Sequence, residues 1–130
     1  MIDGIDHFVL TVENIETTLS FYTRVLGMGV QHFGTPDKPR VALIFGKQKI
    51  NLYPRHAIPD PNVLKPAPDA GDFCLIVSVP LDNLLLHLSH EQVPIVEGPV
   101  WRTGAMGPIR SVYIRDPDLN LIEIAEYLCE

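Results

Sequence analysis

The stretch Tyr113-Ile-Arg-Asp-Pro-Asp-Leu-Asn-Leu-Ile-Glu-Ile-Ala125 predicts two strands joined by a tight turn. Its central residues, Asp116-Pro-Asp118, have the composition of a β-turn with proline at the second position. The second strand carries Glu123 within an apolar run. A carboxylate in such a run has to be solvated, paired or bound to a cation, because burial of an unpaired charge is costly or shifts its pKa. The rest of the chain must therefore supply a partner for Glu123.

The composition indicates a globular protein. The chain has 130 residues, 46% of them apolar, which suits one domain or two small modules that share a core. Its 16 acidic and 10 basic residues give a net charge of −6, and no basic cluster could follow a phosphate backbone. No signal peptide and no apolar run of ~20 residues is present. We expect a cytoplasmic protein that binds neither nucleic acid nor membrane. Cys74 and Cys129 form no disulfide framework and are expected to be reduced.

The first half of the chain predicts the order βαβββ. Residues 5–12 alternate as a strand does, which directs His7 away from the apolar face. A helix begins after Asn14, a favourable N-cap, and ends at Gly27 or Gly29. Short strands are expected at residues 30–33, 41–45 and 49–53.

The second half predicts the same order after a linker that is rich in proline. The expected elements are a strand at 72–79, a helix at 81–90, a short strand at 93–96, a loop at 98–108 and strands at 109–115 and 119–127. We expect an α+β fold of two βαβββ modules, spanning residues 1–53 and 72–130, with the linker at 54–71.

Polar residues interrupt the strands at corresponding places in the two halves. His7 in the first strand of one module corresponds to Asp72 in the first strand of the other. Asn51 corresponds in the same way to Glu123 in the last strands. A pseudo-twofold relation between the modules would bring these four side chains to one point, which is the geometry of a ligand site.

Three stretches carry a family resemblance: Ile5-Asp-His-Phe-Val-Leu-Thr-Val12, then Thr18-Leu-Ser-Phe-Tyr-Thr-Arg-Val-Leu-Gly27 with its FY...LG pattern, and Asp116-Pro-Asp-Leu-Asn-Leu-Ile-Glu123, similar to a DPDGN.IE motif. Through them the chain resembles the vicinal oxygen chelate superfamily, which includes glyoxalase I, extradiol dioxygenases, fosfomycin-resistance enzymes and bleomycin-binding proteins. Residues 48–52 and 97–109 resemble the branch of glyoxalase-domain-containing and bacterial virulence-associated proteins.

The resemblance implies a cupped mixed sheet with a divalent metal inside, usually in a homodimer. The family's metal positions fall on His7, Asn51, Asp72 and Glu123 of this sequence. Asp72 stands where a second histidine is common, and Asn51 stands where glyoxalase has a carboxylate. We assign the metal to His7, Asp72 and Glu123, and Asn51 to substrate binding.

One imidazole and two carboxylates suit Mn, Fe, Co, Ni or Zn and leave positions for two adjacent substrate oxygens. The resemblance then implies a glyoxalase-like lyase or isomerase that stabilises an enediolate or oxyanion, with Glu123 moving the proton as base and then acid. An extradiol-type dioxygenase and a resistance-type protein that binds a small molecule without turnover remain alternatives. A structural alternative pairs His7 with Asp72, and Glu123 with Asn51 or water.

Further side chains are candidates for substrate contacts. Arg102 and Arg110 suit an anionic group, and Trp101 could stack on an apolar one. Tyr53 shares the strand face of Asn51. The remaining candidates are His56, expected as a solvated imidazole, and Cys74, expected as a buried inert thiol.

Overall fold

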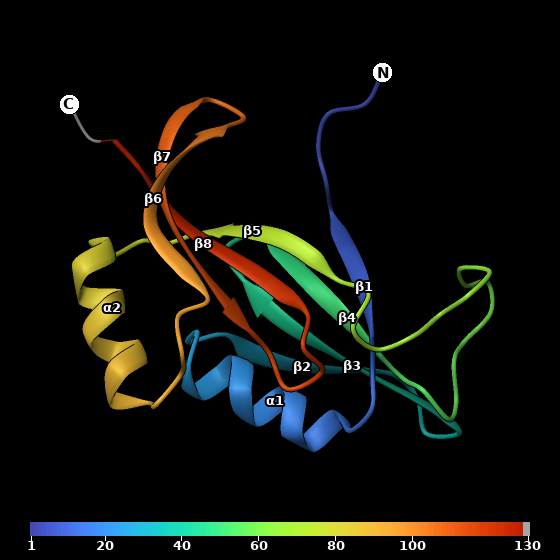
Figure 1. The fold of residues 1–130 in the computed structure, drawn as a ribbon. Coiled ribbons are helices and arrows are strands. Elements are labelled where there is room, and N and C mark those ends of the chain that lie inside the picture. The colour runs from blue at the N-terminus through green and yellow to red at the C-terminus, as the bar shows by residue number, and fades with distance from the viewer. Residues whose placement is uncertain (129–130) are drawn as a thin grey trace. The chain divides into compact units, whose positions relative to one another are not determined.

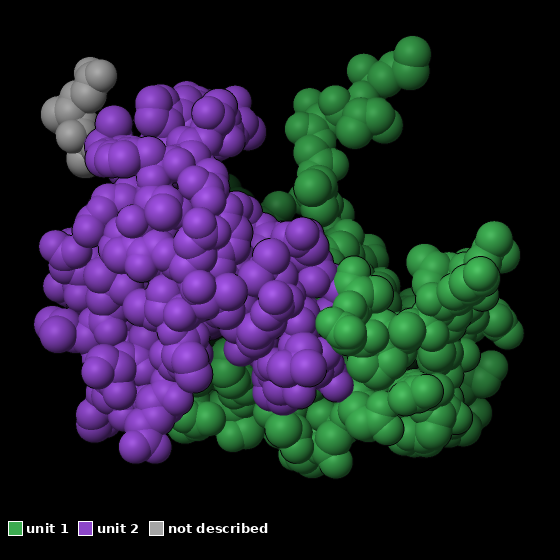
Figure 2. All heavy atoms as spheres, viewed as in Figure 1, with its two compact units in different colours: residues 1–70 green, residues 71–130 purple. Residues whose placement is uncertain are grey.

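The computed structural model describes residues 1–128, so the expectation for Cys129 lies outside the described residues. These residues form two βαβββ modules, which confirms the predicted α+β class (Figure 1). The chain divides into two compact units, Met1–Ala70 and Gly71–Glu130, so the proline-rich segment belongs almost wholly to the first unit (Figure 2). Within residues 1–128, no helix has both the length and the apolar character that crossing a membrane requires.

The first unit contains one mixed four-stranded sheet. Its elements are β1 (His7–Val12), α1 (Ile15–Arg24), β2 (Gly29–Thr35), β3 (Lys38–Phe45) and β4 (Gln48–Pro54). The strand order is β1-β4-β3-β2, with β1 parallel to β4 and the other pairs antiparallel.

The second unit repeats this topology. Its elements are β5 (Asp72–Ile76), α2 (Leu81–His90), β6 (Glu97–Gly104), β7 (Gly107–Arg115) and β8 (Leu121–Tyr127). The strand order is β5-β8-β7-β6, again with a single parallel pair, β5 with β8. The expected mixed sheet is therefore two four-stranded sheets, one in each unit.

Helix α1 covers one face of the first sheet. Asn14 caps the helix by accepting a hydrogen bond from the Thr17 amide at 2.9 Å, and Phe21 and Tyr22 point into the core. Alternate strand residues meet the helix, and they are buried: Leu10, Val12, Ile50 and Leu52. The intervening residues of β1 and β4 consequently belong to the other face of the sheet.

Helix α2 is held to the second sheet at its N-terminus. Pro80 at the N-cap offers no side-chain cap, and the Glu126 carboxylate of β8 accepts the Leu81 amide hydrogen bond at 2.8 Å instead. Arg110 of β7 pairs with Asp82 at 3.2 Å and with Glu126 at 3.7 Å. The helix therefore lies on the sheet face that carries Arg110 and Glu126.

The turn between β7 and β8 is fixed by buried polar groups. The Asp116 carboxylate accepts hydrogen bonds from the Asp118 amide, the Asn120 amide and the Asn120 side chain, each at 2.9 Å. The Asn120 side-chain oxygen accepts from the Gly71 amide at 2.7 Å. The turn thus fixes the start of β8 to the residue that precedes β5.

The sequence expectation was wrong for the segment before β7. Residues 93–96 form no strand, and most of the expected loop at 98–108 is strand β6, so Trp101 and Arg102 are strand residues. Glycine and proline at positions 98 and 99 conceal this strand in the sequence. An edge strand tolerates both, and the register with β7 shifts between Glu97 and Val100.

Leu119 occupies the left-handed region, with φ of +69°, at the place where the DPDGN motif has glycine. Its side chain is largely exposed, so it contributes little packing. Because a residue with a Cβ is strained there and glycine is not, Leu119→Gly should raise the free energy of unfolding by about 0.5–1 kcal/mol after the entropy cost of glycine. Urea denaturation measures the change. Leu119→Ala keeps the strain and is the control; a Gly variant no more stable than the Ala variant would contradict the prediction.

Candidate functional site

The face of the first sheet opposite α1, here called the open face because no helix of this unit covers it, carries three of the predicted site residues. In the parallel pair β1–β4, His7 lies beside Lys49, Val9 beside Asn51 and Thr11 beside Tyr53. The intervening residues of both strands are covered by α1, so these six side chains belong to the opposite face. His7, Asn51 and Tyr53 therefore share one surface.

His7 is oriented by its neighbour in sequence. Its Nδ1 lies 2.8 Å from an Asp6 carboxylate oxygen. An ionised carboxylate only accepts hydrogen bonds, so Nδ1 carries the proton and the lone pair of a neutral ring is on Nε2. A carboxylate bound to one ring nitrogen is the usual support for a histidine that ligates metal through the other.

Asn51 is almost completely buried, with 5% of its surface exposed. Its side-chain oxygen is shielded from solvent and has no hydrogen-bond partner within residues 1–128. Its register neighbours, Val9 and Ala42, have no side-chain donor to offer. A buried acceptor without a donor is costly, so this oxygen is suited to accept a hydrogen bond from a ligand or to bind a cation.

On the second sheet, Glu123 is anchored by Ser111. The Ser111 hydroxyl, which is fully buried, donates to Glu123 Oε2 at 2.6 Å. Cys74 lies beside Glu123 on β5, and Tyr113 lies beside it on β7. One carboxylate oxygen is thus held in place, which fixes the orientation of the group.

The two sheets place their polar residues in the same relation. In the first sheet, Val9 lies beside Asn51, and His7 comes two residues before Val9. In the second sheet, Cys74 lies beside Glu123, and Asp72 comes two residues before Cys74. His7 is therefore situated relative to Asn51 as Asp72 is relative to Glu123, and each pair shares one sheet face.

Cys74 is exposed, so the expectation of a buried thiol was wrong. It alternates with Phe73 and Leu75 and lies on the same face as Asp72 and Glu123. The residue is exposed, but neighbouring atoms desolvate its thiol in part; this desolvation, and to a smaller extent the charge of Glu123, raises the pKa of the Cys74 thiol to about 11. The group is therefore protonated at neutral pH and is a poor nucleophile or metal ligand in that form.

Arg102 reaches the face of Glu123 from strand β6. Its Nε donates to the Tyr113 hydroxyl at 3.1 Å, and its Nη2 lies 3.4 Å from the Glu97 carboxylate. The hydrogen bond to Tyr113, with the charges of Tyr113, Glu97 and Glu123, raises the pKa of Arg102, against a smaller opposing effect of desolvation. The guanidinium is a permanent positive charge near the Glu123 carboxylate.

Two predicted substrate residues lie on the other face of the second sheet. Trp101 pairs with Arg110 in the β6–β7 register, and Arg110 is engaged by Asp82 and Glu126 at the start of α2. The geometry thus gives Arg110 a role in holding the helix, and Trp101 is an exposed residue of the same face. His56, expected as a solvated imidazole, is exposed in the turn after β4.

The donor chemistry suits a divalent cation. Among the described residues 1–128, no group of three or more His, Cys, Asp or Glu side chains is arranged so that it could hold a metal ion. Each of the three assigned donors nevertheless has a lone pair to offer: His7 through Nε2, Glu123 through Oε1, and Asp72 through an exposed carboxylate. These are ligands that Mn, Fe, Co, Ni and Zn accept.

Sequence reasoning missed the residues that orient the donors. Asp6 forms a hydrogen bond with His7, and Ser111 forms one with Glu123. Tyr113, which lies beside Glu123, accepts a hydrogen bond from Arg102. Strand alternation contains a signal for two of them, because Ser111 and Tyr113 alternate along the strand with the buried residues Val112 and Ile114. The identity of their partners depends on strand register, which the sequence does not display.

A repeated βαβββ unit, with polar side chains on the sheet face opposite the helix, defines a class of small α+β proteins built from paired modules. The chain belongs to the Glyoxalase/Bleomycin resistance protein/Dioxygenase superfamily, whose sequence profile matches residues 4–124.

Two relatives are similar over nearly the whole chain. Virulence protein STM3117 of Salmonella typhimurium is 48% identical over 128 residues, covering 98% of this chain and 87% of the relative. Its crystal structure superposes with a TM-score of 0.94, covering 98% of this chain and 99% of that one. Glyoxalase domain-containing protein RDO1 of Mycosarcoma maydis is 45% identical, covering 95% of this chain and 68% of the relative.

A lactoylglutathione lyase from Agrobacterium tumefaciens has the same fold at greater distance. It is 23% identical, with a TM-score of 0.71, and the match covers 97% of this chain and 95% of the lyase. Likeness at this identity concerns the fold alone.

The raised pKa of Cys74 predicts slow alkylation by iodoacetamide, with a rate that rises with pH toward about 11 because only the thiolate reacts. Glu123→Gln removes a negative charge beside the thiol, so the pKa should fall and the rate at pH 8 should rise a few-fold. Mass spectrometry of the Cys74 peptide in a Cys129→Ser background measures the rate. Glu16→Gln, on exposed α1 surface, is the matched control. An unchanged rate in Glu123→Gln would show that this charge does not reach the thiol.

Proposed function

We propose that the protein is a divalent-metal-dependent enzyme of glyoxalase-like type, a lyase or isomerase acting on a small substrate with vicinal oxygens. The observation that carries the proposal is the supported donor set: Asp6 frees His7 Nε2, and Ser111 anchors Glu123 while leaving its second oxygen available. Hydrogen bonds that hold a side chain so that one of its atoms stays available are typical of residues that bind a ligand or metal.

In this proposal His7, Asp72 and Glu123 hold the ion. A bound divalent metal would supply Lewis-acid stabilisation for the charge that develops on two adjacent substrate oxygens. Glu123, when its Oε1 is released from the ion, takes a proton from a substrate carbon through that oxygen and returns it to the neighbouring carbon. Ser111 keeps the carboxylate oriented throughout, because its hydroxyl holds Oε2. Arg102, held by Tyr113 and paired with Glu97, has further N–H donors that suit a negatively charged group of the substrate.

A resistance-type binding protein is the second candidate, and Asn51 favours it. A neutral amide stands in place of the carboxylate common in glyoxalase, and its unpartnered oxygen is suited to accept a hydrogen bond from a bound molecule. Such a protein would sequester its ligand without turnover.

Cobalt binding tests the donor assignment. We expect stoichiometric Co(II) after dialysis, most of it lost in His7→Ala and in Glu123→Ala, because each removes a ligand. Asp6→Asn should weaken binding by about 10- to 100-fold, since it removes only the support of the imidazole. Isothermal titration and the visible spectrum of Co(II) report the affinity and the ligand field. His56→Ala and Glu16→Ala are matched controls with exposed side chains. Equal metal content in the wild type, His7→Ala and Glu123→Ala would refute the assignment.

The same metal-loaded protein distinguishes the reactions. Isomerisation of a hemithioacetal without oxygen uptake supports the lyase or isomerase. Oxygen uptake with ring cleavage of a catechol would overturn the lyase or isomerase proposal and identify a dioxygenase. Saturable ligand binding without turnover would overturn it and identify a binding protein.

We further propose a homodimer. Each four-stranded sheet has two edge strands, β1 and β2 in one unit and β5 and β6 in the other, which have one neighbour apiece within their own sheet. Sedimentation equilibrium at micromolar concentration should give twice the chain mass of 14.5 kDa. A species of chain mass at that concentration would reject the dimer.

A further inference from the structure

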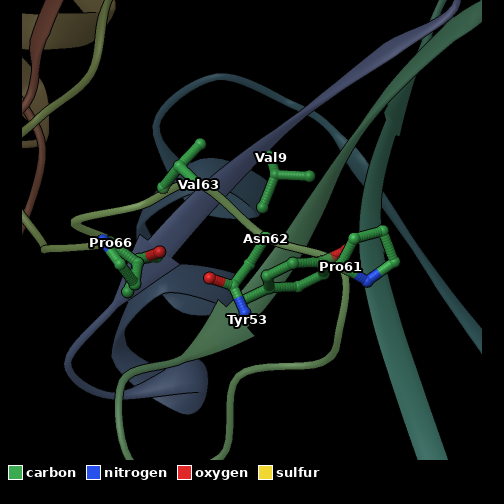
Figure 3. Close-up of a pocket in the computed structure, with 7 residues that line it drawn as sticks. Val9, Tyr53, Pro61, Asn62, Val63 and Pro66 are labelled. Atoms are coloured by element: carbon green, nitrogen blue, oxygen red, sulfur yellow. The ribbon is translucent and has the colours of Figure 1, made fainter.

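A pocket of about 380 Å³ lies between the first sheet and the proline-rich segment of the same unit. Val9, Thr11 and Tyr53 line it from β1 and β4, and Pro61, Val63 and Pro66 line it from the segment. Figure 3 shows Val9 and Tyr53 on their strands, and Pro61, Asn62, Val63 and Pro66 on the neighbouring segment. The lining is mostly apolar, and the volume falls within the range of roughly 300–1,000 Å³ typical of small-molecule sites.

The wall formed by the segment has internal support. The Asn62 side-chain amide donates to the Pro59 carbonyl and to the Asp60 carboxylate, each at 3.1 Å. Prolines restrict the backbone on both sides of Asn62. The segment therefore presents a shaped surface to the sheet.

Two cations lie near this pocket on the neighbouring strands without lining it, and Arg40 reaches it through Tyr53. The Arg40 guanidinium carbon is 5.1 Å from the ring centroids of both Phe33 and Tyr53, and its Nη2 donates to the Tyr53 hydroxyl at 3.3 Å. The Lys49 ammonium is 4.1 Å from the Phe33 centroid and 3.5 Å from the Gln31 side-chain oxygen. The aromatic rings fix both charges in position.

Neither cation has an ion pair with a carboxylate within the described residues 1–128. Arg55 and Arg102, by contrast, each have one such ion pair, and Arg110 has two. In a chain of net charge −6, two fixed cations without acidic partners form a local positive site. The planar fork of Arg40 suits a carboxylate, and the ring of Tyr53 connects it to the apolar pocket.

We propose that this pocket binds a carboxylate that carries a compact apolar or aromatic group. The apolar group enters between Tyr53 and the segment, and the carboxylate binds Arg40, with Lys49 adding charge. Binding here requires neither a metal ion nor turnover, so the inference stands apart from the proposed reaction.

Benzoate tests the inference, with benzamide as a neutral molecule of the same shape. In the wild-type protein without added metal, ¹H–¹⁵N spectra should show saturable shifts at Tyr53, Asn62 and Val63, with benzoate bound about tenfold or more tightly than benzamide. Arg40→Gln should weaken benzoate by about tenfold or more and leave benzamide within about twofold. Equal affinity for the two molecules, or shifts only outside the pocket, would overturn the proposal.

A matched pair of variants tests the location. Val63→Trp places a large side chain in the pocket and should abolish the shifts, whereas Leu64→Trp alters the next residue, which does not line it. Both positions are exposed, so neither change disturbs the core. If the two variants bind benzoate equally well, the pocket is not the site. Phenyl phosphate in place of benzoate identifies the anion: tighter binding than benzoate would overturn the assignment to a carboxylate.

Discussion

Burial of one face of each sheet is the constraint on which the rest of the structure depends. Because successive side chains of a strand point to opposite faces, covering the apolar residues with a helix commits every intervening residue to the other face. In the first unit α1 buries Leu10 and Ile50, and His7 and Asn51 are placed together as a result. In the second unit, the burial of Ile122 and Ile124 directs the intervening Glu123 to the opposite face of its sheet. The polar faces follow from the packing of the apolar ones.

Register then decides which polar residues meet. The buried turn of Asp116 and Asn120 fixes the start of β8 to Gly71, immediately before β5, and so helps to set Cys74 beside Glu123. A slip of one residue would turn Glu123 toward α2. The family motif in this stretch therefore sets the strand register, and the position of the Glu123 carboxylate follows from that register.

The sequence is most informative where local chemistry and packing agree. Helix α2 was predicted at its observed bounds, and Asn14 acts as the expected N-cap of α1. Strand β6 was missed because Gly98 and Pro99 disfavour a strand locally, whereas an edge position accepts them. Alternation predicted the common face of Asn51 and Tyr53, but the stacking of Arg40 on Tyr53 depends on the neighbouring strand and follows from no local pattern.

The distribution of charge separates two kinds of arginine in this molecule. Arg110 is satisfied by Asp82 and Glu126, and its charge is used to attach α2 to its sheet. Arg40 is held by aromatic rings, which position a cation without neutralising it. A carboxylate partner would have supplied similar rigidity and cancelled the charge. Aromatic support at Arg40 therefore preserves a positive group on the open face, next to Asn51's strand, where an otherwise acidic protein can attract an anion.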